Sequence, residues 1–363
     1  MAVLALRSIA DLPALAASLP LAVRLLFDRI YRVTPTESHL RVPETMVPWV
    51  EEHFGPREAV EHQALVRVDN VVTGEGTLFN ALRARRPVPV TLDQPIAGQF
   101  DGDVWADPLA STPEDTFGRL QNRHGMTAAN VARYDTQHSL IVFAEPDPLK
   151  FSIEGLAGHI ELALDWFAKA QASDPDAIYP YLMWNCLWRA GGSVVHGHMQ
   201  ASLARERHFA KIERLRADAE AYRQRYHASY FDDLAAVHRA LGLEVGGVVN
   251  EGRVLAHLTP IKEKEVLILL PELTPSAAAP LFAVLRTLVG RLGVRSFNMG
   301  MLMPPRGVSP ESWEGFPVLV RLVDRGPLES RTSDWGAMEM FAQSVVAADP
   351  FDLARELAEE TGA

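Results

Sequence analysis

Apolar side chains recur along the chain with two spacings, and the change of spacing marks the predicted elements. Short apolar runs at 139–144 and 179–185 are typical of buried strands, and a third follows at 194–203. Between the first two runs the apolar period is that of a helix over 153–172, set by Leu156, Ile160, Leu164 and Phe167. We therefore expect strand, helix, strand, strand in this part of the chain.

The same order returns roughly 120 residues later. The predicted elements are strands at 253–257 and 265–270, a helix opened by proline at 275–292, and strands at 296–303 and 316–323. A closing helix is expected at 349–360. We interpret this as a duplicated α+β unit.

The remaining segments complete the predicted organisation. Residues 1–70 are expected to form a helical N-terminal extension packed on the body, and a hairpin is predicted with strands at 64–72 and 77–80. Residues 91–125, rich in Pro, Gly and Asp, are expected to be a loop, and 204–243 a charged helical region. The predicted units are the extension 1–70, a first repeat over 71–243 and a second repeat over 244–363.

Composition narrows the class of protein. The 363 residues are 48% hydrophobic and 22% charged, which is ordinary for a globular protein. A formal net charge of −11 argues against a partner that is a nucleic-acid polymer, whereas a small phosphorylated ligand remains possible. The single cysteine, Cys186, excludes an internal disulfide and a Cys-x-x-Cys clip. With no apolar run long enough to span a membrane, we expect a cytoplasmic protein.

One segment carries the chemistry. His196, His198 and Gln200 follow one another at every second position inside an apolar run. Side chains alternate along a strand, so these three would line one face. Two imidazoles and an amide on one face can hold a phosphate and attack it. The preceding Gly191, Gly192 and Ser193 would offer backbone N–H groups to an anion.

Other interpretations of these residues stay open. A His-x-His pair can be a metal site, and a histidine on a strand can be a purely structural residue. Arg83, Arg85 and Arg86 form the densest basic cluster and are candidate phosphate ligands, although arginines before a proline often only coat a surface. Tyr181 could stack on a base or a sugar, or could pack in the core.

The spacing N-x7-S-x2-H-x-H-x-Q, from Asn185 through Ser193, His196 and His198 to Gln200, closely resembles the galactose-1-phosphate uridylyltransferase family of the histidine triad superfamily. Weaker similarity covers about two thirds of the chain, including 78–87 and the tail from 333. The resemblance implies two fused copies of the triad fold, each an antiparallel sheet with packed helices, of which only the first keeps the two histidines of this motif. The second copy has FPVLVRLV where the first has HGHMQ.

The resemblance also implies a role for each matching residue. His198 matches the nucleophile that attacks the α-phosphorus of a nucleoside diphosphate sugar and becomes covalently nucleotidylated. Gln200 matches the residue that binds the phosphoryl oxygen, and Asn185 and Ser193 match phosphate contacts. His196 matches a supporting residue that is a metal ligand in zinc-containing members. We expect a neutral His198 ring whose second nitrogen donates to a backbone carbonyl.

This chain departs from the zinc-containing members, because they carry a Cys-x-x-Cys pair and a further histidine that are missing here. The segment 143–149, FAEPDPL, has no histidine, and neither does 315–323 in the second copy. We therefore predict no zinc, no other metal and no cofactor.

The function expected from these points is transfer of a nucleoside monophosphate from a nucleotide sugar to a sugar 1-phosphate, with ping-pong kinetics. Two alternatives remain: a phosphorylase that uses inorganic phosphate on a nucleotide sugar or a dinucleoside polyphosphate, and a catalytically silent nucleotide-binding protein. The base, the sugar, the role of the first 70 residues and the oligomeric state stay open, with a homodimer as one option.

Overall fold

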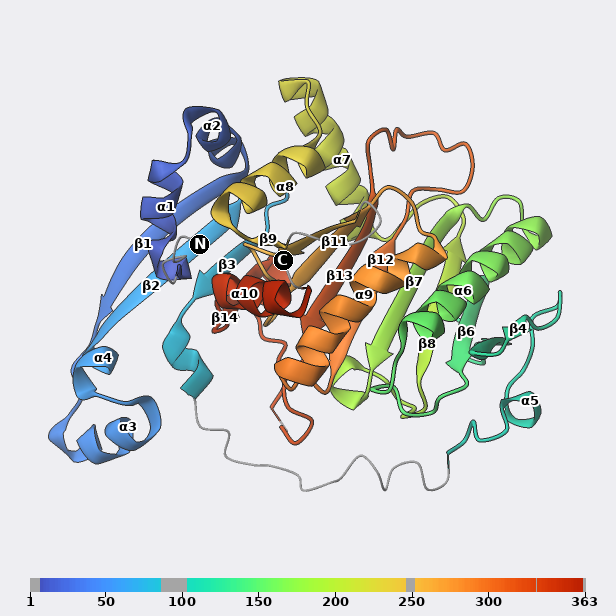
Figure 1. The fold of residues 1–363 in the computed structure, drawn as a ribbon, viewed down its shortest axis with the longest axis horizontal. Coiled ribbons are helices and arrows are strands. Elements are labelled where there is room, and N and C mark those ends of the chain that lie inside the picture. The colour runs from blue at the N-terminus through green and yellow to red at the C-terminus, as the bar shows by residue number, and fades with distance from the viewer. Residues whose placement is uncertain (1–6, 86–102, 246–251, 331, 362–363) are drawn as a thin grey trace.

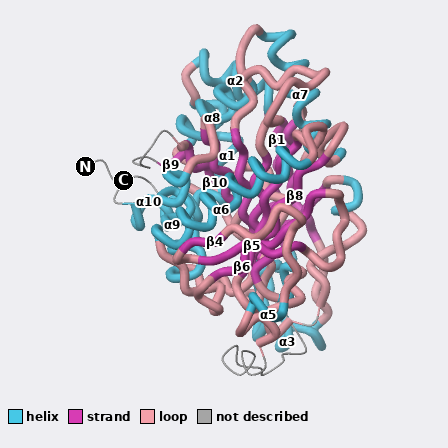
Figure 2. Tube along the Cα trace, turned by 90° about the vertical axis from the view of Figure 1, so that its right-hand side faces the viewer, coloured by secondary structure: helices cyan, strands magenta, loops and turns pink. Residues whose placement is uncertain are grey.

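The computed structural model describes residues 7–85, 103–245, 252–330 and 332–361. A large sheet of ten strands, with helices packed on it, forms the body of the molecule. A smaller sheet of four strands lies beside it (Figure 1). In the view turned by 90°, α9 and α10 lie on one side of the strands and α2, α7 and α8 lie above them (Figure 2). The predicted α+β class is confirmed.

The large sheet runs in the order β4-β5-β6-β8-β7-β12-β13-β11-β10-β9, and every neighbouring pair is antiparallel. Its first-half strands are β4 Gln121–Asn122, β5 Gly125–Ala129, β6 Gln137–Phe143, β7 Tyr179–Cys186 and β8 His198–Ala204. Its second-half strands are β9 Glu244–Val245, β10 Arg253–Ala256, β11 Val266–Leu270, β12 Phe297–Leu302 and β13 Val318–Asp324.

The strand order confirms the duplication. Reading outward from the central pair, the first half runs β7, β8, β6, β5 and the second runs β12, β13, β11, β10. Chain order is equivalent too, because the helix α6 Ile153–Ser173 precedes β7 and the helix α9 Ala278–Leu285 precedes β12. The two copies therefore join along β7 and β12 into one continuous sheet.

The two faces of the sheet differ in burial. On β7 the side chains of Leu182, Trp184 and Cys186 are buried in the main core, to which α6 and α9 also contribute. The alternate side chains of Tyr181, Met183 and Asn185 are only partly buried. One face is thus closed by helices (Figure 1), and the other is open enough to hold a site.

The first 70 residues are not purely helical, and this part of the prediction is wrong. Besides α1 Leu12–Ser18, α2 Leu21–Ile30, α3 Val47–Phe54 and α4 Arg57–Glu61, they contain β1 Tyr31–His39 and β2 His62–Asn70. These strands pair with each other over nine positions, and that long-range pairing gives no clear local period. No described helix is long and apolar enough to cross a membrane.

The small sheet draws on both ends of the chain. Its order is β1-β2-β3-β14, with β3 Gly76–Phe79 and β14 Gln343–Val346 pairing in parallel. β2 and β3 form the predicted hairpin. The remaining helices are α5 Pro108–Ser111, α7 Ala210–Tyr226, α8 Tyr230–Leu241 and the closing α10 Pro350–Thr361. The sheet therefore spans the predicted boundaries at 70 and 243.

Buried charges tie the small sheet to the large one. Arg321 of β13 donates from Nε to Glu265 Oε1 at 2.5 Å and from Nη1 to Glu75 Oε1 at 3.0 Å. Lys211 of α7 reaches the same Glu75 oxygen at 2.6 Å. Burial acts to raise the pKa of Glu75, but the neighbouring Arg321 and Lys211 cations outweigh it and lower the pKa to about 2.

We expect Glu75→Gln to lower the free energy of unfolding at pH 7. We also expect this free energy to fall less on acidification than in the wild type. The folded pKa of Glu75 lies below its ordinary value of 4.5, so its stabilising effect is full above pH 4.5 and is lost as the pH falls toward about 2. Breaking a buried ion pair costs about 3 kcal/mol. Urea unfolding at pH 7 and at about pH 3 measures both effects. The exposed Glu51→Gln is the control, and a wild-type pH slope in Glu75→Gln would contradict the assignment.

Candidate active site

The predicted histidine strand is shorter than expected. β8 begins at His198, so the prediction that it starts at residue 194 and holds His196 is wrong. The Gly197 N–H donates to the carbonyl of Pro146 at 2.8 Å, and the Gly197 carbonyl accepts from the Phe143 N–H at 2.9 Å. These bonds turn the backbone away from β7. Only His198 and Gln200 keep the alternating arrangement on the open face.

His196 is a buried support for the site. Its Nδ1 lies 2.6 Å from Asp103 Oδ2, and its Nε2 lies 2.8 Å from the backbone oxygen of Phe143. Both partners are acceptors, so the two ring nitrogens are occupied by Asp103 and by the Phe143 carbonyl. His196 therefore holds the loop 194–197 against β6.

His198 has the arrangement of a nucleophile. Its Nδ1 donates to the backbone oxygen of His196 at 2.8 Å, so the lone pair is on Nε2. No hydrogen bond to Nε2 occurs within the described ranges. Burial lowers the pKa of His198 and outweighs the bond to the His196 carbonyl, which raises it. The ring is thus neutral at pH 7 with its free nitrogen unprotonated, and the expected backbone partner is confirmed.

Gln200 is held by a residue that the sequence did not indicate. Its Oε1 lies 3.0 Å from Nε2 of His138, which Asn130 Nδ2 also approaches at 3.3 Å. His138 Nδ1 is buried without a partner among the described residues, so we place the ring proton on Nε2, where it bonds the Gln200 oxygen. Burial lowers the pKa of His138. The NH2 group of Gln200 is then left to donate to a ligand.

Asn185 is fixed from the second repeat. Its Oδ1 accepts from Asn298 Nδ2 at 2.7 Å, and Asn298 in turn accepts from Arg325. Arg325 makes two bonds to Asp334, at 2.6 and 2.8 Å. The Asn185 amide nitrogen has only a 3.9 Å contact with the Met183 sulfur. It can therefore donate to a phosphate beside His198.

The glycine-rich lead-in does not form the expected anion cradle. The Gly191 N–H donates to the Trp188 carbonyl at 3.0 Å and the Gly192 N–H to the Leu187 carbonyl at 2.9 Å, so neither is free. Gly192 is needed for packing instead, because a Cβ there would lie 2.7 Å from the backbone oxygen of Asn185. Ser193 is exposed.

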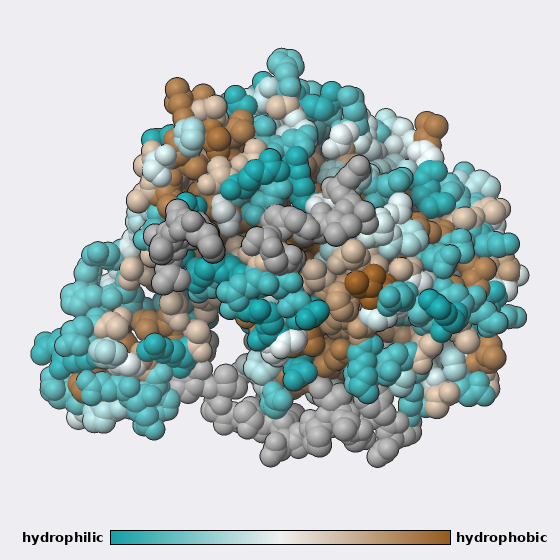
Figure 3. Space-filling view, in the orientation of Figure 1, coloured by the Kyte–Doolittle hydropathy of each residue, from teal (hydrophilic) through white to brown (hydrophobic). Residues whose placement is uncertain are grey.

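The arginine cluster lies apart from the histidines. Arg85 is exposed and donates to the carbonyl of Phe54 at 2.8 Å. Arg83 lines a groove with Met46 and Trp49 on the α3 lobe, the projection at the lower left of Figure 3. Neither has a hydrogen bond to the histidine site in the described parts of the chain, and Arg86 lies outside them. The expected phosphate role of Arg83 and Arg85 therefore finds no support in the contacts within one chain.

The donor set does not fit a zinc ion at His196, because both of its ring nitrogens already face acceptors. Among the described residues no group of three or more His, Cys, Asp or Glu side chains is arranged to hold a metal. Cys186 is buried, and burial raises its pKa, which disfavours the thiolate that metals bind.

Four site residues escaped the sequence analysis. Asp103 holds His196, and Trp105 packs its ring edge-to-face with His198 at 4.8 Å between centroids. Both lie in the Pro-, Gly- and Asp-rich segment, which has no periodicity. His138 immediately precedes the predicted strand 139–144. Asn298 could have been found, because an antiparallel pairing of the two central strands places it opposite Asn185.

Comparison with known proteins identifies the architecture. No family model and no curated protein sequence matches the chain. An ADP-glucose phosphorylase from Arabidopsis thaliana with bound ADP-glucose superposes with a TM-score of 0.59 at 14% identity, covering 79% of this chain and 96% of the other. A uridylyltransferase gives a TM-score of 0.56 at 12% identity, with 81% and 98% covered. The chain has the fold of these proteins.

A GalT-like protein from Arabidopsis thaliana is similar to the same degree, with a TM-score of 0.56 at 14% identity over 80% of this chain and 97% of the other. The resemblance stated from the Asn185–Gln200 motif is thus confirmed for the fold, including its two repeats.

The protonation of His198 can be tested directly. We expect ¹⁵N NMR of the labelled protein to show a neutral Nδ1–H ring at pH 7, because Nδ1 has a fixed acceptor and Nε2 has none. Its titration midpoint should fall below the ordinary value of 6.5, since burial disfavours the cation by more than the His196 carbonyl favours it. The urea-unfolded chain gives the reference. A proton found on Nε2, or a midpoint above the reference, would contradict the assignment.

Proposed function

We propose that this chain is a nucleotidyltransferase in which Nε2 of His198 attacks the α-phosphorus of a nucleotide sugar. The observation that carries the proposal is the His198–His196 bond of 2.8 Å, which keeps the proton on Nδ1 and the lone pair on Nε2. The fold of an ADP-glucose phosphorylase and a uridylyltransferase supports it.

Both half-reactions exchange one bond to phosphorus for another, and His198 Nε2 takes part in each of them. As the bond from Nε2 to phosphorus forms, the bond from phosphorus to the bridging oxygen breaks and a sugar 1-phosphate leaves with that oxygen. The His198 ring gains positive charge in this step. The His196 carbonyl, which accepts from its Nδ1–H, stabilises that charge. In the second half-reaction a phosphate oxygen of the acceptor attacks phosphorus and releases Nε2.

The neighbouring amides would stabilise the phosphoryl oxygens. The NH2 of Gln200 and Nδ2 of Asn185 lie on the open face and keep N–H groups that no oxygen or nitrogen acceptor fills among the described residues. Preorganised donors of this kind act where negative charge develops in the transition state. No general acid is required, because an acceptor phosphate oxygen attacks without losing a proton.

A phosphorylase using the same nucleophile is the second candidate. The observation that favours it is the likeness to the ADP-glucose phosphorylase, with inorganic phosphate replacing the sugar phosphate as acceptor. We also propose that the site works without zinc, since both nitrogens of His196 are engaged by Asp103 and Phe143. Elemental analysis of the purified protein addresses this point.

The covalent step is tested by intact mass spectrometry. The protein is incubated with nucleotide sugars and dinucleoside polyphosphates of each base, without an acceptor. We expect one donor to add the mass of a nucleoside monophosphate to the wild type and none to add it to His198→Ala. The exposed His39→Ala should be modified like the wild type. Chasing the adduct with phosphate or with sugar 1-phosphates separates the two candidates. No adduct and no turnover with any donor would overturn the proposal.

The His138–Gln200 contact predicts non-additive kinetics. We expect Gln200→Ala to slow adduct formation about 100-fold, as for loss of one oxyanion donor. His138→Phe should slow it about tenfold by freeing the Gln200 amide to rotate. In the double variant, His138→Phe should add nothing further, because its effect passes through Gln200. Additive losses in rapid-quench measurements would mean that His138 acts independently of Gln200 and would contradict this assignment.

A further inference from the structure

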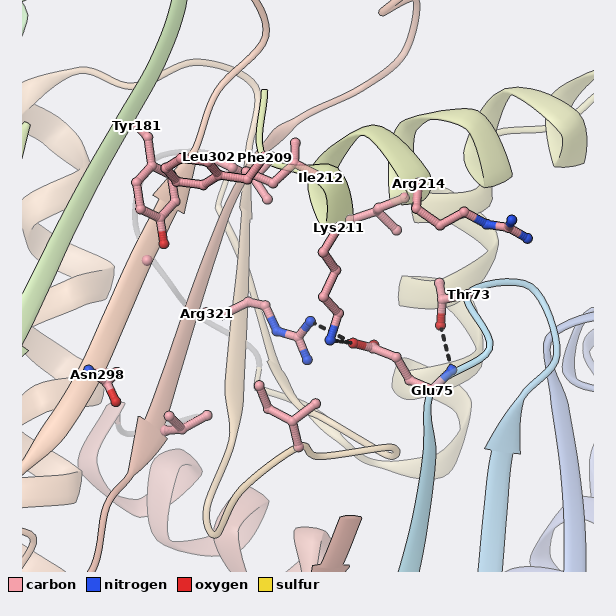
Figure 4. Close-up of a pocket in the computed structure, with 14 residues that line it drawn as sticks. Thr73, Glu75, Tyr181, Phe209, Lys211, Ile212, Arg214, Asn298, Leu302 and Arg321 are labelled. Carbon is pink, nitrogen blue, oxygen red and sulfur yellow. Dashed lines mark hydrogen bonds and ion pairs between the residues drawn. The ribbon is translucent and has the colours of Figure 1, made fainter. Parts of the chain in front are cut away.

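A cavity of about 310 Å³ opens on the second repeat. It lies between β12 and β13 on one side and α7 with the β2–β3 turn on the other (Figure 4). Its polar side chains come from the β2–β3 turn, β7, α7, β12 and β13, and no step of the chemistry above uses it.

The cavity and the histidine site share the open face of the large sheet. The registers place Gln200, Met183, Gly300 and Arg321 in one row across β8, β7, β12 and β13. Paired residues point to the same face, so Gly300 and Arg321, which line the cavity, lie on the side of Gln200. Three strand spacings of about 4.8 Å separate the ends of this row by roughly 14 Å.

Asn298 connects the two places. It lines the cavity, and its amide also holds Asn185, one of the two proposed phosphate donors. The ring of Trp105, which contacts His198, packs against Leu140 and Val142 of β6, the neighbour of β8 on the side away from β7. A ligand whose phosphate rests on His198, Gln200 and Asn185 therefore extends one end toward Trp105 and the other over Asn298 into the cavity.

The cavity wall combines apolar surface with fixed polar groups. Tyr181 and Phe209 pack edge-to-face at 5.1 Å between centroids, and Leu302 lies beside them (Figure 4). The Tyr181 hydroxyl has no protein hydrogen bond in the described ranges and lies over Gly300. A Cβ at Gly300 would come within 2.5 Å of that hydroxyl oxygen, so glycine is what allows this position of the ring.

The charges at the cavity cancel. Lys211 and Arg321 both bond Glu75, Arg321 also bonds Glu265, and Arg214 pairs with Asp218 at 2.8 Å. Such a site does not favour a second phosphate. It offers hydrogen-bond donors and acceptors from several directions. This arrangement suits a sugar ring, which has hydroxyls around its whole rim, because each hydroxyl both donates and accepts. A nucleobase presents its polar groups along one edge.

We propose that this cavity holds the carbohydrate body of the sugar phosphate, both as the leaving group of the donor and as the acceptor. This assignment rests on the proposed function and adds the orientation of the substrate: the sugar over β12 and β13, and the nucleoside on the Trp105 side of His198.

The test separates the two halves of the substrate. Calorimetric titration measures binding of glucose 1-phosphate, galactose 1-phosphate and other hexose and pentose 1-phosphates, and separately of AMP, UMP, GMP and CMP. Tyr181→Phe removes one hydroxyl with little change in packing, and Tyr226→Phe on α7, outside the cavity, is its matched control. We expect Tyr181→Phe to weaken binding of the sugar 1-phosphate that the wild type binds by about three- to tenfold, with monophosphate binding unchanged.

Phe209→Ala, at a half-exposed position on the cavity rim, is a second variant with low risk to folding, and it should act in the same direction. Weaker binding of the nucleoside monophosphate with unchanged sugar phosphate would place the nucleoside in the cavity and overturn the proposal. So would unchanged binding of both, or no sugar phosphate binding to the wild type. Failure of the proposed function is distinct, since it appears as the absence of a His198 adduct in the wild type.

Discussion

The antiparallel pairing of β7 with β12 is the contact on which the rest of the molecule depends. Six residue pairs, from Phe297 with Cys186 to Leu302 with Tyr181, merge two repeats into one sheet. Neither repeat then leaves its central strand as an open edge. The same register sets Asn298 beside Asn185, so the second repeat, although it has no histidine on β13, orients a donor in the first.

The second repeat has exchanged reactive side chains for structural ones. Its strand β13, the equivalent of β8, carries Arg321, which lies in one row with Gln200 of β8. Burial opposes the charge of Arg321, but Glu265 and Glu75 raise its pKa, so it stays a cation between two carboxylates. The half of the sheet that has no nucleophile thereby anchors the small sheet and shapes the cavity.

Much of the large sheet could be predicted, because burial imposes a local period on β6, α6, β7 and their equivalents in the second repeat. The placement of His196 could not, since the turn before β8 is fixed by Phe143 and Pro146, about fifty residues earlier. The phosphate role of Arg83 and Arg85 stays a prediction, because proximity to other basic residues in sequence says nothing about distance from His198. Asp103 and His138 are polar residues without a distinctive local pattern. Their orienting roles follow only from their contacts with His196 and Gln200, which depend on the tertiary structure.

The parallel pairing of β3 with β14 determines when the small sheet can be completed during synthesis. Gly76–Phe79 meets its neighbour only after Gln343–Val346 has been made, and Ile9 donates to the carboxylate of Asp349 at 2.7 Å. During synthesis the hairpin of β2 and β3 therefore waits with one edge unpaired while more than 260 residues are added. Completion of the small sheet is a late event that requires the C-terminal segment to leave the ribosome, so a prematurely terminated chain would carry an open strand edge.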